Sequence, residues 1–506
     1  MAQIRQETEV DRTQAALSAE GLELPLTRGT IEITVAPGVE ATAGGQRLTA
    51  LLVNILARMK GVVRDIRIVI HDNPRILGGT PLWAERFGDG LTALVDSLNA
   101  AGSTIQSSLT IGCAEEATVR VQVGGPPAGA DIVAGSDAWR ALLGAYSAEA
   151  DWSAASQIGP SLAAVVTAVE VFKRIVAANA WRTDARHAPA DFAFSGLNYG
   201  VDGDAAVGPD VGAVRLSDTG IVGAGAGGSG TAYVLAMHPR LTGILGLIEP
   251  GFHKMSNLNR YLAAAASDVH TPRHKLSSLV DHLARFAPSL ALDLHARPWE
   301  QLDAHPWGTL ISAVDTIEAR WQIQRRARRD AIIIDLAVDD LLYTVLRVTP
   351  AGRCLFCKHP FDPDLAVNQR ALRWGAPPDT IRVWTVTNRP VDREILEALA
   401  HTQGRDPEDF IELLGMPFSE TPRLLECGST TLRADVPSQA PVLPLATTAV
   451  AVIGAAELIK NAAGLPPLDN WLAHDLRRSP ARPWVKRRGP LGGCPEHDDR
   501  ASGQDW

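Results

Sequence analysis

The stretch Ile221–Gly230, IVGAGAGGSG, decides the fold class. It contains a G-x-G-x-x-G pattern at Gly223, Gly225 and Gly228, after residues typical of a strand and before an apolar segment typical of a helix. Glycines let the backbone turn tightly and approach a phosphate, and the first N–H groups of the helix attract the anion. The stretch therefore predicts the strand–loop–helix unit of a doubly wound, Rossmann-like α/β sheet that binds a nucleotide.

An acid follows at the end of the next expected strand. Ile244–Ile248 is apolar and ends at Glu249, where a carboxylate can bind ribose hydroxyls. With these features alone, an NAD-dependent oxidoreductase fits equally well, and a tight turn that binds no ligand is a less favoured alternative. The residues further along the chain have to decide.

Four polar residues downstream favour a triphosphate. Asn257 and Arg260 stand three residues apart, Lys275 follows, and Asp315 ends another expected strand. A guanidinium can clamp phosphate oxygens in bidentate fashion, the cations neutralise the phosphates, and the acid can hold Mg²⁺. Hydride transfer does not need this set, so we expect ATP and Mg²⁺ as ligands. The alternative, which is favoured for any one of these residues taken alone, is an ordinary polar or charged surface residue.

The first half of the chain repeats the same order of elements. Its expected strand Thr30–Val35 precedes Gly44-Gly45 and a helix at Leu48–Met59, and a further strand, Ile66–Ile70, ends at His71-Asp72. The later expected matches are Leu109–Cys113 with Leu290–Leu294, Asp131–Asp137 with Leu310–Asp315, and the helices Ala163–Ala177 and Thr448–Ala462. Any α/β protein could produce such matches, but their common order favours a duplication. The first half has no Asn/Arg pair and a poor glycine loop, so we expect that it does not bind ATP.

Cysteine spacing predicts a metal site. Cys354 and Cys357 form a C-x-x-C pair, and Cys494 with His497 forms a C-x-x-H pair near the C-terminus. Two such pairs can enclose one tetrahedral Zn²⁺, which would have a structural role because no coordination position stays open. The alternatives are free thiols without a metal, and His359 as the fourth ligand.

These motifs together resemble the ThiF/MoeB-like activating enzymes, which include the ubiquitin-activating enzymes. The resemblance covers about residues 217–497 and rests on GAGAGGSG, the strand-end acid, SNLNR, the downstream Lys and VDTIEAR. It implies that Glu249, in place of the usual Asp, binds ribose, that Asn257 and Arg260 contact the ATP phosphates, and that Lys275 assists them. Asp315 would be the Mg²⁺-linked acid, although Thr316 replaces the Asn that usually follows it.

The resemblance also implies a domain plan and a nucleophile. The first half resembles the inactive half of a pseudo-dimeric ubiquitin-activating enzyme. In symmetric relatives an Arg from the partner's N-terminal segment reaches ATP, and Arg5 and Arg12 are the candidates here.

Cys427 lies where relatives often place their reactive Cys, and its thiolate would form a thioester from the acyl-adenylate. The alternative for Cys427 is an inert, partly buried thiol. We expect the domains to be an inactive adenylation-like domain (1–185), a linker (186–216), the ATP-binding domain (217–359), a cysteine-bearing insertion (360–435), and a return to that domain with the zinc clip (436–506).

The expected function is therefore activation of a ubiquitin-like protein, which a ubiquitin-conjugating-like enzyme would then receive. The domain plan resembles the activating enzyme of a bacterial ubiquitin-like (Bil-type) conjugation operon with an antiphage role. The alternatives are a sulfur-carrier adenylyltransferase of molybdopterin or thiamine synthesis, and a non-catalytic nucleotide-binding scaffold.

The bulk composition agrees with such a protein. With 506 residues the chain should hold two or more domains, and a net charge of -9 argues against nucleic acid as a partner. No stretch reads as a clean membrane span, and the N-terminus carries no apolar signal-peptide core, so we expect a cytoplasmic protein without a membrane partner. A homodimer is a further expectation, which the sequence leaves open. In the symmetric dimers of the resembled family, a second copy takes the position that the first half has in this chain.

Overall fold

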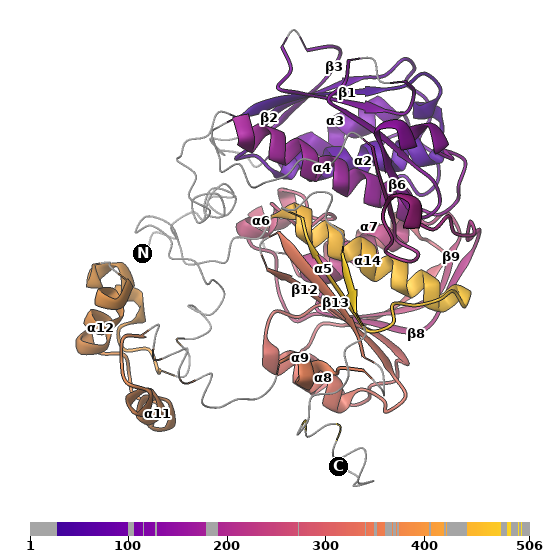
Figure 1. Ribbon diagram of the computed structural model, residues 1–506. Helices are drawn as coiled ribbons and strands as arrows, with labels where there is room; N and C mark the ends of the chain where they lie inside the picture. Colours follow the sequence, from indigo (N-terminus) through magenta and orange to yellow (C-terminus); the bar gives the residue numbers. More distant parts are fainter. Residues whose placement is uncertain are drawn as a thin grey trace. The chain divides into compact units, whose positions relative to one another are not determined.

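The computed structural model (Figure 1) divides the described part of the chain into two compact units. Residues 28–358 and 443–497 belong to the first unit, and residues 359–421 belong to the second. The residues that the structure describes are 28–99, 106–114, 116–126, 129–178, 191–271, 273–339, 341–348, 352–359, 367, 371, 374–403, 406–418, 421, 443–476, 483–486, 494 and 497.

The first sheet has seven strands in the order β3-β2-β1-β4-β5-β6-β7. The pairs from β3 to β5 are parallel, and β5–β6 and β6–β7 are antiparallel. Its strands are β1 (Gly29–Val35), β2 (Val63–Val69), β3 (Ser108–Ile111), β4 (Val119–Val123), β5 (Ile132–Ser136), β6 (Arg140–Leu143) and β7 (Phe192–Ser195).

The second sheet repeats this plan and adds one strand. Its order is β10-β9-β8-β11-β12-β13-β14-β15, again parallel up to the fifth strand and antiparallel beyond it. Its strands are β8 (Val214–Val222), β9 (Leu241–Ile248), β10 (Leu290–His295), β11 (Thr309–Ser312), β12 (Ile332–Asp339), β13 (Leu342–Arg347), β14 (Trp471–Asp475) and β15 (Trp484–Lys486). The two mostly parallel sheets confirm the predicted fold class and the internal duplication.

One predicted match within the duplication is wrong. The segment Asp131–Asp137 contains β5, which occupies the position of β12, whereas Leu310–Asp315 contains β11, whose counterpart is β4. The two segments look alike because both are short apolar strands that end at an acid. Position in the sheet, which decides the true match, depends on pairing between strands and is not visible in a local pattern.

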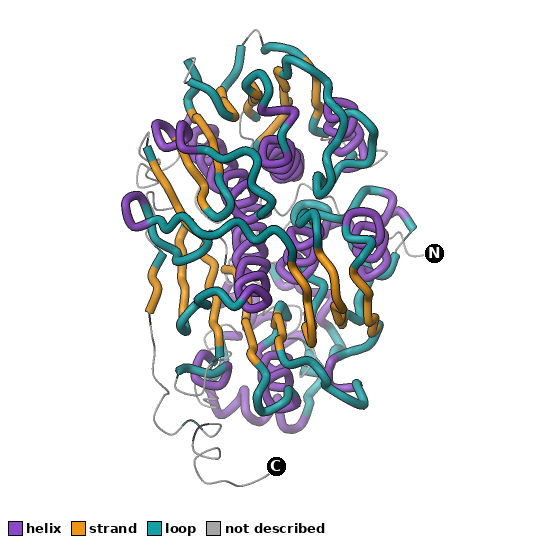
Figure 2. Tube along the Cα trace, turned by 90° about the vertical axis from the view of Figure 1, so that its right-hand side faces the viewer, coloured by secondary structure: helices purple, strands orange, loops and turns teal. Residues whose placement is uncertain are grey.

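Four long helices lie between the two sheets. Helices α2 and α4 pack on each other, as do α5 and α14, and α14 also contacts both α2 and α4 (Figures 1 and 2). The helices of this unit are α2 (Ala43–Arg58), α3 (Phe87–Leu98), α4 (Ile158–Ala178), α5 (Ala226–Ala236), α6 (Ser267–His270), α7 (Lys275–Phe286), α8 (Ile317–Arg326), α9 (Leu355–Lys358) and α14 (Pro444–Ala463). The short 3₁₀ helices are η1 (Val39–Ala41), η2 (Gly144–Glu149), η3 (Asp202–Asp204), η4 (Met255–Asn257) and η5 (Trp299–Gln301).

Helix α14 is a core helix. In the part of the chain that the structure describes, it is the one helix whose length and composition would suit a membrane span. Its most apolar window is 89% buried inside the protein, because the helix packs against α5, α4 and the second sheet.

The glycine pair of the first half does not form the expected loop. Gly44 and Gly45 lie in the first turn of α2, which therefore begins before the expected Leu48. Thr42 caps this helix, and its side chain accepts a hydrogen bond from the Gly45 N–H at 3.1 Å. A Cβ atom at Gly45 would stand 2.2 Å from the carbonyl oxygen of Val39, so the second glycine is there for packing.

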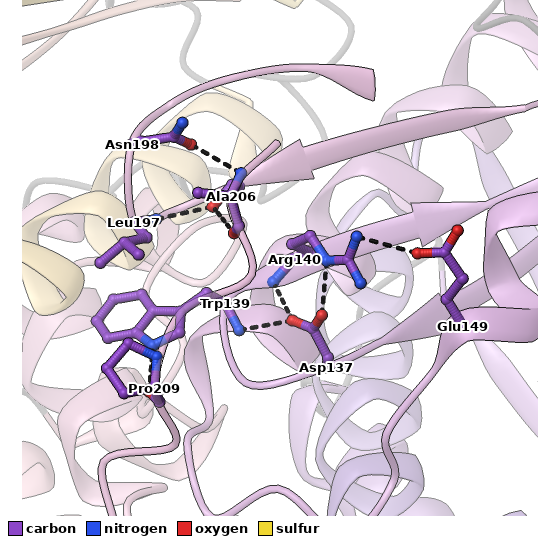
Figure 3. Close-up of polar contacts among 9 residues, drawn as sticks. Asp137, Trp139, Arg140, Glu149, Leu197, Asn198, Ala206 and Pro209 are labelled. Carbon is purple, nitrogen blue, oxygen red and sulfur yellow. Dashed lines mark hydrogen bonds and ion pairs between the residues drawn. The ribbon is translucent and has the colours of Figure 1, made fainter. Parts of the chain in front are cut away.

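The segment 186–216 is not the simple linker that the sequence predicted. Its residues Phe192–Ser195 form β7, the edge strand of the first sheet. The Ser195 hydroxyl donates to the Ala206 carbonyl at 2.8 Å. The Trp139 indole donates to the Pro209 carbonyl at 2.8 Å (Figure 3). The described part of this stretch folds back on the first half, which therefore extends well beyond residue 185.

The second unit has its own apolar core. Its elements are α11 (Pro378–Thr387), α12 (Arg393–Gln403) and the 3₁₀ helix η6 (Pro407–Leu413), which Asp406 caps. Trp374 and Trp384 both pack against Phe418, at centroid distances of 4.9 and 5.3 Å. The two tryptophans thus fill the core of this unit.

Candidate active site

The glycine loop joins β8 to α5 at the carboxyl edge of the second sheet. Gly223 has a φ of +90°, and a Cβ at Gly228 would stand 1.9 Å from the Gly223 carbonyl oxygen. Both glycines are therefore required by the fold of the loop. A Cβ at Gly225 would meet no atom closer than 3.7 Å. Gly225 is also the N-cap of α5 and supplies no side-chain cap, so the first N–H groups of the helix are available to an anion.

Glu249 and Lys275 form an ion pair beside this loop. Glu249 follows β9, the strand next to β8, and Lys275 is the first residue of α7. The Lys275 ammonium lies 3.2 Å from Glu249 Oε1, which also accepts a hydrogen bond from the Gly251 N–H at 2.8 Å. Burial alone would lower the pKa of Lys275, but Tyr261 and Glu249 raise it above its usual value. Lys275 is therefore a firmly protonated cation at this edge.

The loop after Glu249 carries the predicted Asn and Arg. Asn257 ends η4, and its side-chain oxygen accepts a hydrogen bond from the Lys254 N–H at 2.8 Å, which leaves the NH₂ end as the group that could face a phosphate. Arg260 donates to the Ser256 carbonyl at 2.6 Å and to Asn259 Oδ1 at 2.8 Å. Burial lowers the pKa of Arg260, but an arginine keeps its charge under all ordinary conditions.

Tyr261 connects these groups, and the sequence reasoning missed it. Its ring centroid lies 5.6 Å from Arg260 Cζ and 5.7 Å from Lys275 Nζ. Its hydroxyl lies 3.7 Å from the position that a Cβ would occupy at Gly225. The glycine loop, Arg260 and Lys275 thus surround one buried tyrosine. An aromatic residue directly after SNLNR was the available signal, but nothing in its type indicated a role.

Asp315 lies at the same edge, on the other side of the glycine loop. It follows β11, the second neighbour of β8, and its side chain is exposed. The backbone of this segment touches the loop, since the Ala313 carbonyl oxygen would lie 2.7 Å from a Cβ at Gly223. Thr316 caps α8 by accepting from the Ala319 N–H at 3.2 Å, so its departure from the usual Asn keeps a competent N-cap residue.

The predicted nucleotide residues thus converge on the crevice where strand order reverses. Glu249 and Asp315 follow the two strands that flank β8, and open α/β sheets bind ligands at this position. In the structure Arg260 and Lys275 each lie near the Tyr261 ring, the Tyr261 hydroxyl lies beside Gly225, and Glu249 pairs with Lys275. Asp315 lies at the other side of the loop.

The equivalent position in the first half is filled by its own chain. The Gly44 N–H, at the start of α2, donates to the Trp152 carbonyl oxygen at 3.2 Å. A Cβ at Gly44 would lie 3.1 Å from that same oxygen, and one at Gly124 would lie 3.2 Å from the Trp152 ring. Trp152 therefore occupies the space next to the helix N-terminus that a phosphate would need, which supports the prediction that this half does not bind ATP.

The cysteine pairs come together as a cluster. Cys354, Cys357, Cys494 and His497 place their ligand atoms within 4.8 Å of one another, so the fourth member of the set is His497 rather than His359. The Cys354 sulfur lies 3.7 Å from each of the other two sulfurs. A tetrahedral site with Zn–S bonds of about 2.3 Å separates its sulfurs by about 3.8 Å, so the donors fit Zn²⁺. Burial and the neighbouring thiols raise the pKa of Cys494 to about 12, so a thiolate there needs a cation beside it.

Comparison with known proteins identifies the family. The sequence model described as the ThiF family matches residues 207–482, more than half of the chain. The chain belongs to the ThiF family. The match begins at the end of the first half and spans every described residue of the nucleotide site.

The chain is also similar to a curated protein and to solved structures. The uncharacterized protein y4jF of Sinorhizobium fredii is 25% identical over 344 residues, which are 66% of this chain and 65% of that protein. E. coli MccB with ATP has 11% identity and a TM-score of 0.34, over 56% of this chain and 65% of that one. The microcin C7 biosynthetic enzyme MccB in complex with N-formylated MccA has 13% identity and a TM-score of 0.36, over 56% and 67%.

Three predicted residues of this ThiF-family chain lie outside the described residues. These are Cys427, the proposed nucleophile, and Arg5 and Arg12, the candidates for a nucleotide contact from the N-terminal segment. Their roles stay predictions.

Proposed function

We propose that the chain adenylates the C-terminal carboxylate of a ubiquitin-like protein with Mg²⁺ and ATP. The observation that carries the proposal is the cluster around Tyr261, where two cations and the open Gly225 meet at an uncapped helix N-terminus. Such a cluster suits a polyanion better than a dinucleotide, because a hydride-transfer site needs no pair of cations beside the loop. An ATP-consuming reaction also fits the expected cytoplasmic location.

The first step is an in-line substitution at the α-phosphorus of ATP. A carboxylate oxygen of the terminal residue forms a bond to this phosphorus, and the bond to the β-phosphate bridging oxygen breaks, so pyrophosphate leaves. Arg260, Lys275 and the N–H groups of α5 would stabilise the charge on the phosphate oxygens, and Glu249 would hold the ribose. Bound Mg²⁺ would supply further charge neutralisation, and Asp315, exposed beside the loop, is its proposed ligand.

The second step would transfer the acyl group to Cys427. Its thiolate attacks the acyl carbonyl of the adenylate, a C–S bond forms, and AMP leaves with the carboxyl oxygen that it received. A conjugating-like enzyme would then take the acyl group by thiol exchange. The insertion before Cys427 fits the cysteine-carrying type of activating enzyme, which is why we favour a bacterial ubiquitin-like conjugation system, with an antiphage role, over a sulfur-carrier pathway.

Isotope exchange between pyrophosphate and ATP tests the first step. The full chain should catalyse exchange with ubiquitin-like proteins encoded beside its gene, and Arg260→Ala should reduce exchange at least ~100-fold, since single oxyanion-type contacts are worth that much. Arg328→Ala is the matched control, because Arg328 is an exposed arginine paired with Asp218 and Asp330. Absence of exchange with every candidate would leave a nucleotide-binding scaffold as the better description.

A reducible adduct tests the second step. The chain, Mg²⁺, ATP and the carrier should give a covalent species that dithiothreitol cleaves and that Cys427→Ala does not form. Exchange without such an adduct would favour the sulfur-carrier alternative. Cys113→Ser is the control, since Cys113 is an exposed thiol of the first half.

A further inference from the structure

A buried arginine of the first half binds the nucleotide loop of the second half. Arg58 lies in the last turn of α2, in the helical layer between the sheets (Figure 1), and its side chain is buried. Its guanidinium donates to the carbonyl oxygen of Leu258 at 2.5 Å and to those of Leu262 and Ala264 at 2.9 Å each. One side chain thus holds three successive points of the segment that carries Asn257, Arg260 and Tyr261.

Two neighbours complete this anchor. Asn54, one turn before Arg58, accepts from Arg58 Nε at 2.7 Å and donates to the Leu262 carbonyl at 3.1 Å. At the far end of the segment, the Ala266 N–H donates to the carbonyl of Ser97, which lies in α3 of the first half. The first half therefore forms hydrogen bonds to the backbone of the segment 258–266 at four positions.

The segment 258–266 that the first half binds has little regular secondary structure of its own. Residues 258–266 contain only turns between the short helices η4 and α6. Leu258, Tyr261, Ala264 and Ala266 form a small apolar cluster with Ala226, at the start of α5. Two of the three carbonyls that Arg58 binds belong to packed residues of this cluster, Leu258 and Ala264, so displacement of Arg58 would release the backbone that sets the positions of Arg260 and Tyr261.

A buried guanidinium is costly unless hydrogen bonds replace its lost water. Three carbonyls and an amide oxygen do so here, and all three carbonyls belong to the other half of the molecule. From this geometry we propose that Arg58, supported by Asn54, is a positioning residue for the nucleotide site: the half that does not bind ATP orders the phosphate-binding loop of the half that does. This inference rests on the proposed function for its link to ATP, but not for the ordering itself.

Hydrogen exchange of the full chain without nucleotide tests the ordering. The N–H groups of Arg260 and Tyr261 both donate to the Asn257 carbonyl, so their protection reports the order of the loop. In Arg58→Lys, which keeps the charge but cannot reach all four acceptors, exchange within residues 257–266 should accelerate on the order of ten-fold. Asn54→Ala should act in the same direction with a smaller effect.

Arg47→Lys is the matched control. Arg47 is a second buried arginine of α2, and it too donates to backbone carbonyls, those of Ala155 and Gly78, but both belong to the first half. We expect Arg47→Lys to lose about as much folding stability as Arg58→Lys, but without faster hydrogen exchange within residues 257–266. If Arg58→Lys and Asn54→Ala leave the exchange of this segment unchanged, or if Arg47→Lys accelerates it equally, the inference is wrong.

Nucleotide affinity, measured by calorimetry, tests the consequence. The dissociation constant of Mg·ATP should rise on the order of ten-fold in Arg58→Lys and stay at the wild-type value in Arg47→Lys, because small displacements of phosphate ligands are costly. Faster exchange with unchanged affinity would reduce Arg58 to a structural residue and overturn the positioning role. If the wild type bound no ATP, the proposed function would fail, while the exchange comparison would still decide whether Arg58 orders the loop.

Discussion

Replacing Gly225 and Gly228 one at a time by alanine should separate ligand binding from folding in the glycine loop. A Cβ at Gly225 would have 3.7 Å to its nearest neighbours, the Ala313 carbonyl and the Tyr261 hydroxyl. The backbone there is extended, with φ at −65°, which alanine adopts without strain. Gly225→Ala should therefore change the free energy of unfolding by less than about 1 kcal/mol.

The same methyl group should oppose nucleotide binding. The methyl would project from the helix N-terminus at the point where the backbone has to approach a phosphate. Loss of one hydrogen bond to a charged phosphate costs about 1.5–3 kcal/mol, which corresponds to a dissociation constant raised on the order of 10- to 100-fold. Gly225→Ala should thus be a folded protein with weak ATP binding.

For Gly228→Ala we expect the reverse, with the main effect on folding stability rather than on ATP affinity. Its methyl would stand 1.9 Å from the Gly223 carbonyl oxygen, and real Cβ atoms do not approach closer than 3.0 Å, so the loop must open by about 1 Å. Overpacking of this kind costs about 1–3 kcal/mol. Melting temperature without nucleotide and ATP affinity by calorimetry, measured on both variants, give the comparison. Wild-type ATP affinity in Gly225→Ala, or a wild-type melting temperature in Gly228→Ala, would refute the reasoning.

Three further predictions concern buried charge, acid sensitivity and the metal cluster. Asp335→Asn should destabilise the chain by about 3–5 kcal/mol, because the buried Asp335 carboxylate pairs with Arg320 at 2.9 Å and with Lys358 at 2.7 Å. The control is Asp330→Asn, at an exposed ion pair, which should have no measurable effect on the melting temperature. Burial lowers the pKa of His282 to about 3, so below pH ~6.5 the unfolded chain binds a proton at His282 that the folded chain does not bind. The free energy of unfolding should therefore fall as the pH drops from about 6.5 toward 3, by about 2 kcal/mol at pH 5. If the melting temperature of a His282→Phe variant fell equally on acidification, this prediction would be contradicted. Elemental analysis should find one zinc per chain, lost in Cys494→Ser but retained in Cys113→Ser, and a chain that keeps its zinc without Cys494 would exclude the four-ligand site.

Short-range features were readable from the sequence because their physical cause is local. The glycine loop needs particular residues at fixed spacing to avoid clashes such as that at Gly228. The strands and helices around it follow from apolar patterns, and the observed β8, α5 and β9 agree with the expected segments. The C-x-x-C spacing likewise bends two ligands toward one point, and the structure brings both pairs together.

The errors came where local sequence looks the same in different tertiary settings. The sequence placed Gly44 and Gly45 before the helix, in a poor glycine loop, but Thr42 caps the helix early and Trp152 fills the space in front of it. The stretch 186–216 has the composition of a linker, yet its strand β7 completes the first sheet. In both cases the partner that decides the structure lies far away in the chain.

The sequence by itself therefore determined the family, the fold class and the residues of the glycine loop, because backbone sterics and short spacings carry that information. Only the tertiary structure decided that the Tyr261 ring lies beside both cations, that Trp152 fills the space in front of α2 in the first half, and that Arg58 binds the backbone of a loop in the other half. For Trp152 and Arg58 the physical reason is that their contacts join residues that lie far apart in the chain, 200 positions in the case of Arg58 and Leu258, and involve backbone carbonyls, which are present at every position and leave no trace in the sequence. Tyr261 is close to both cations in the chain, but the turns that bring its ring beside them follow from the tertiary fold.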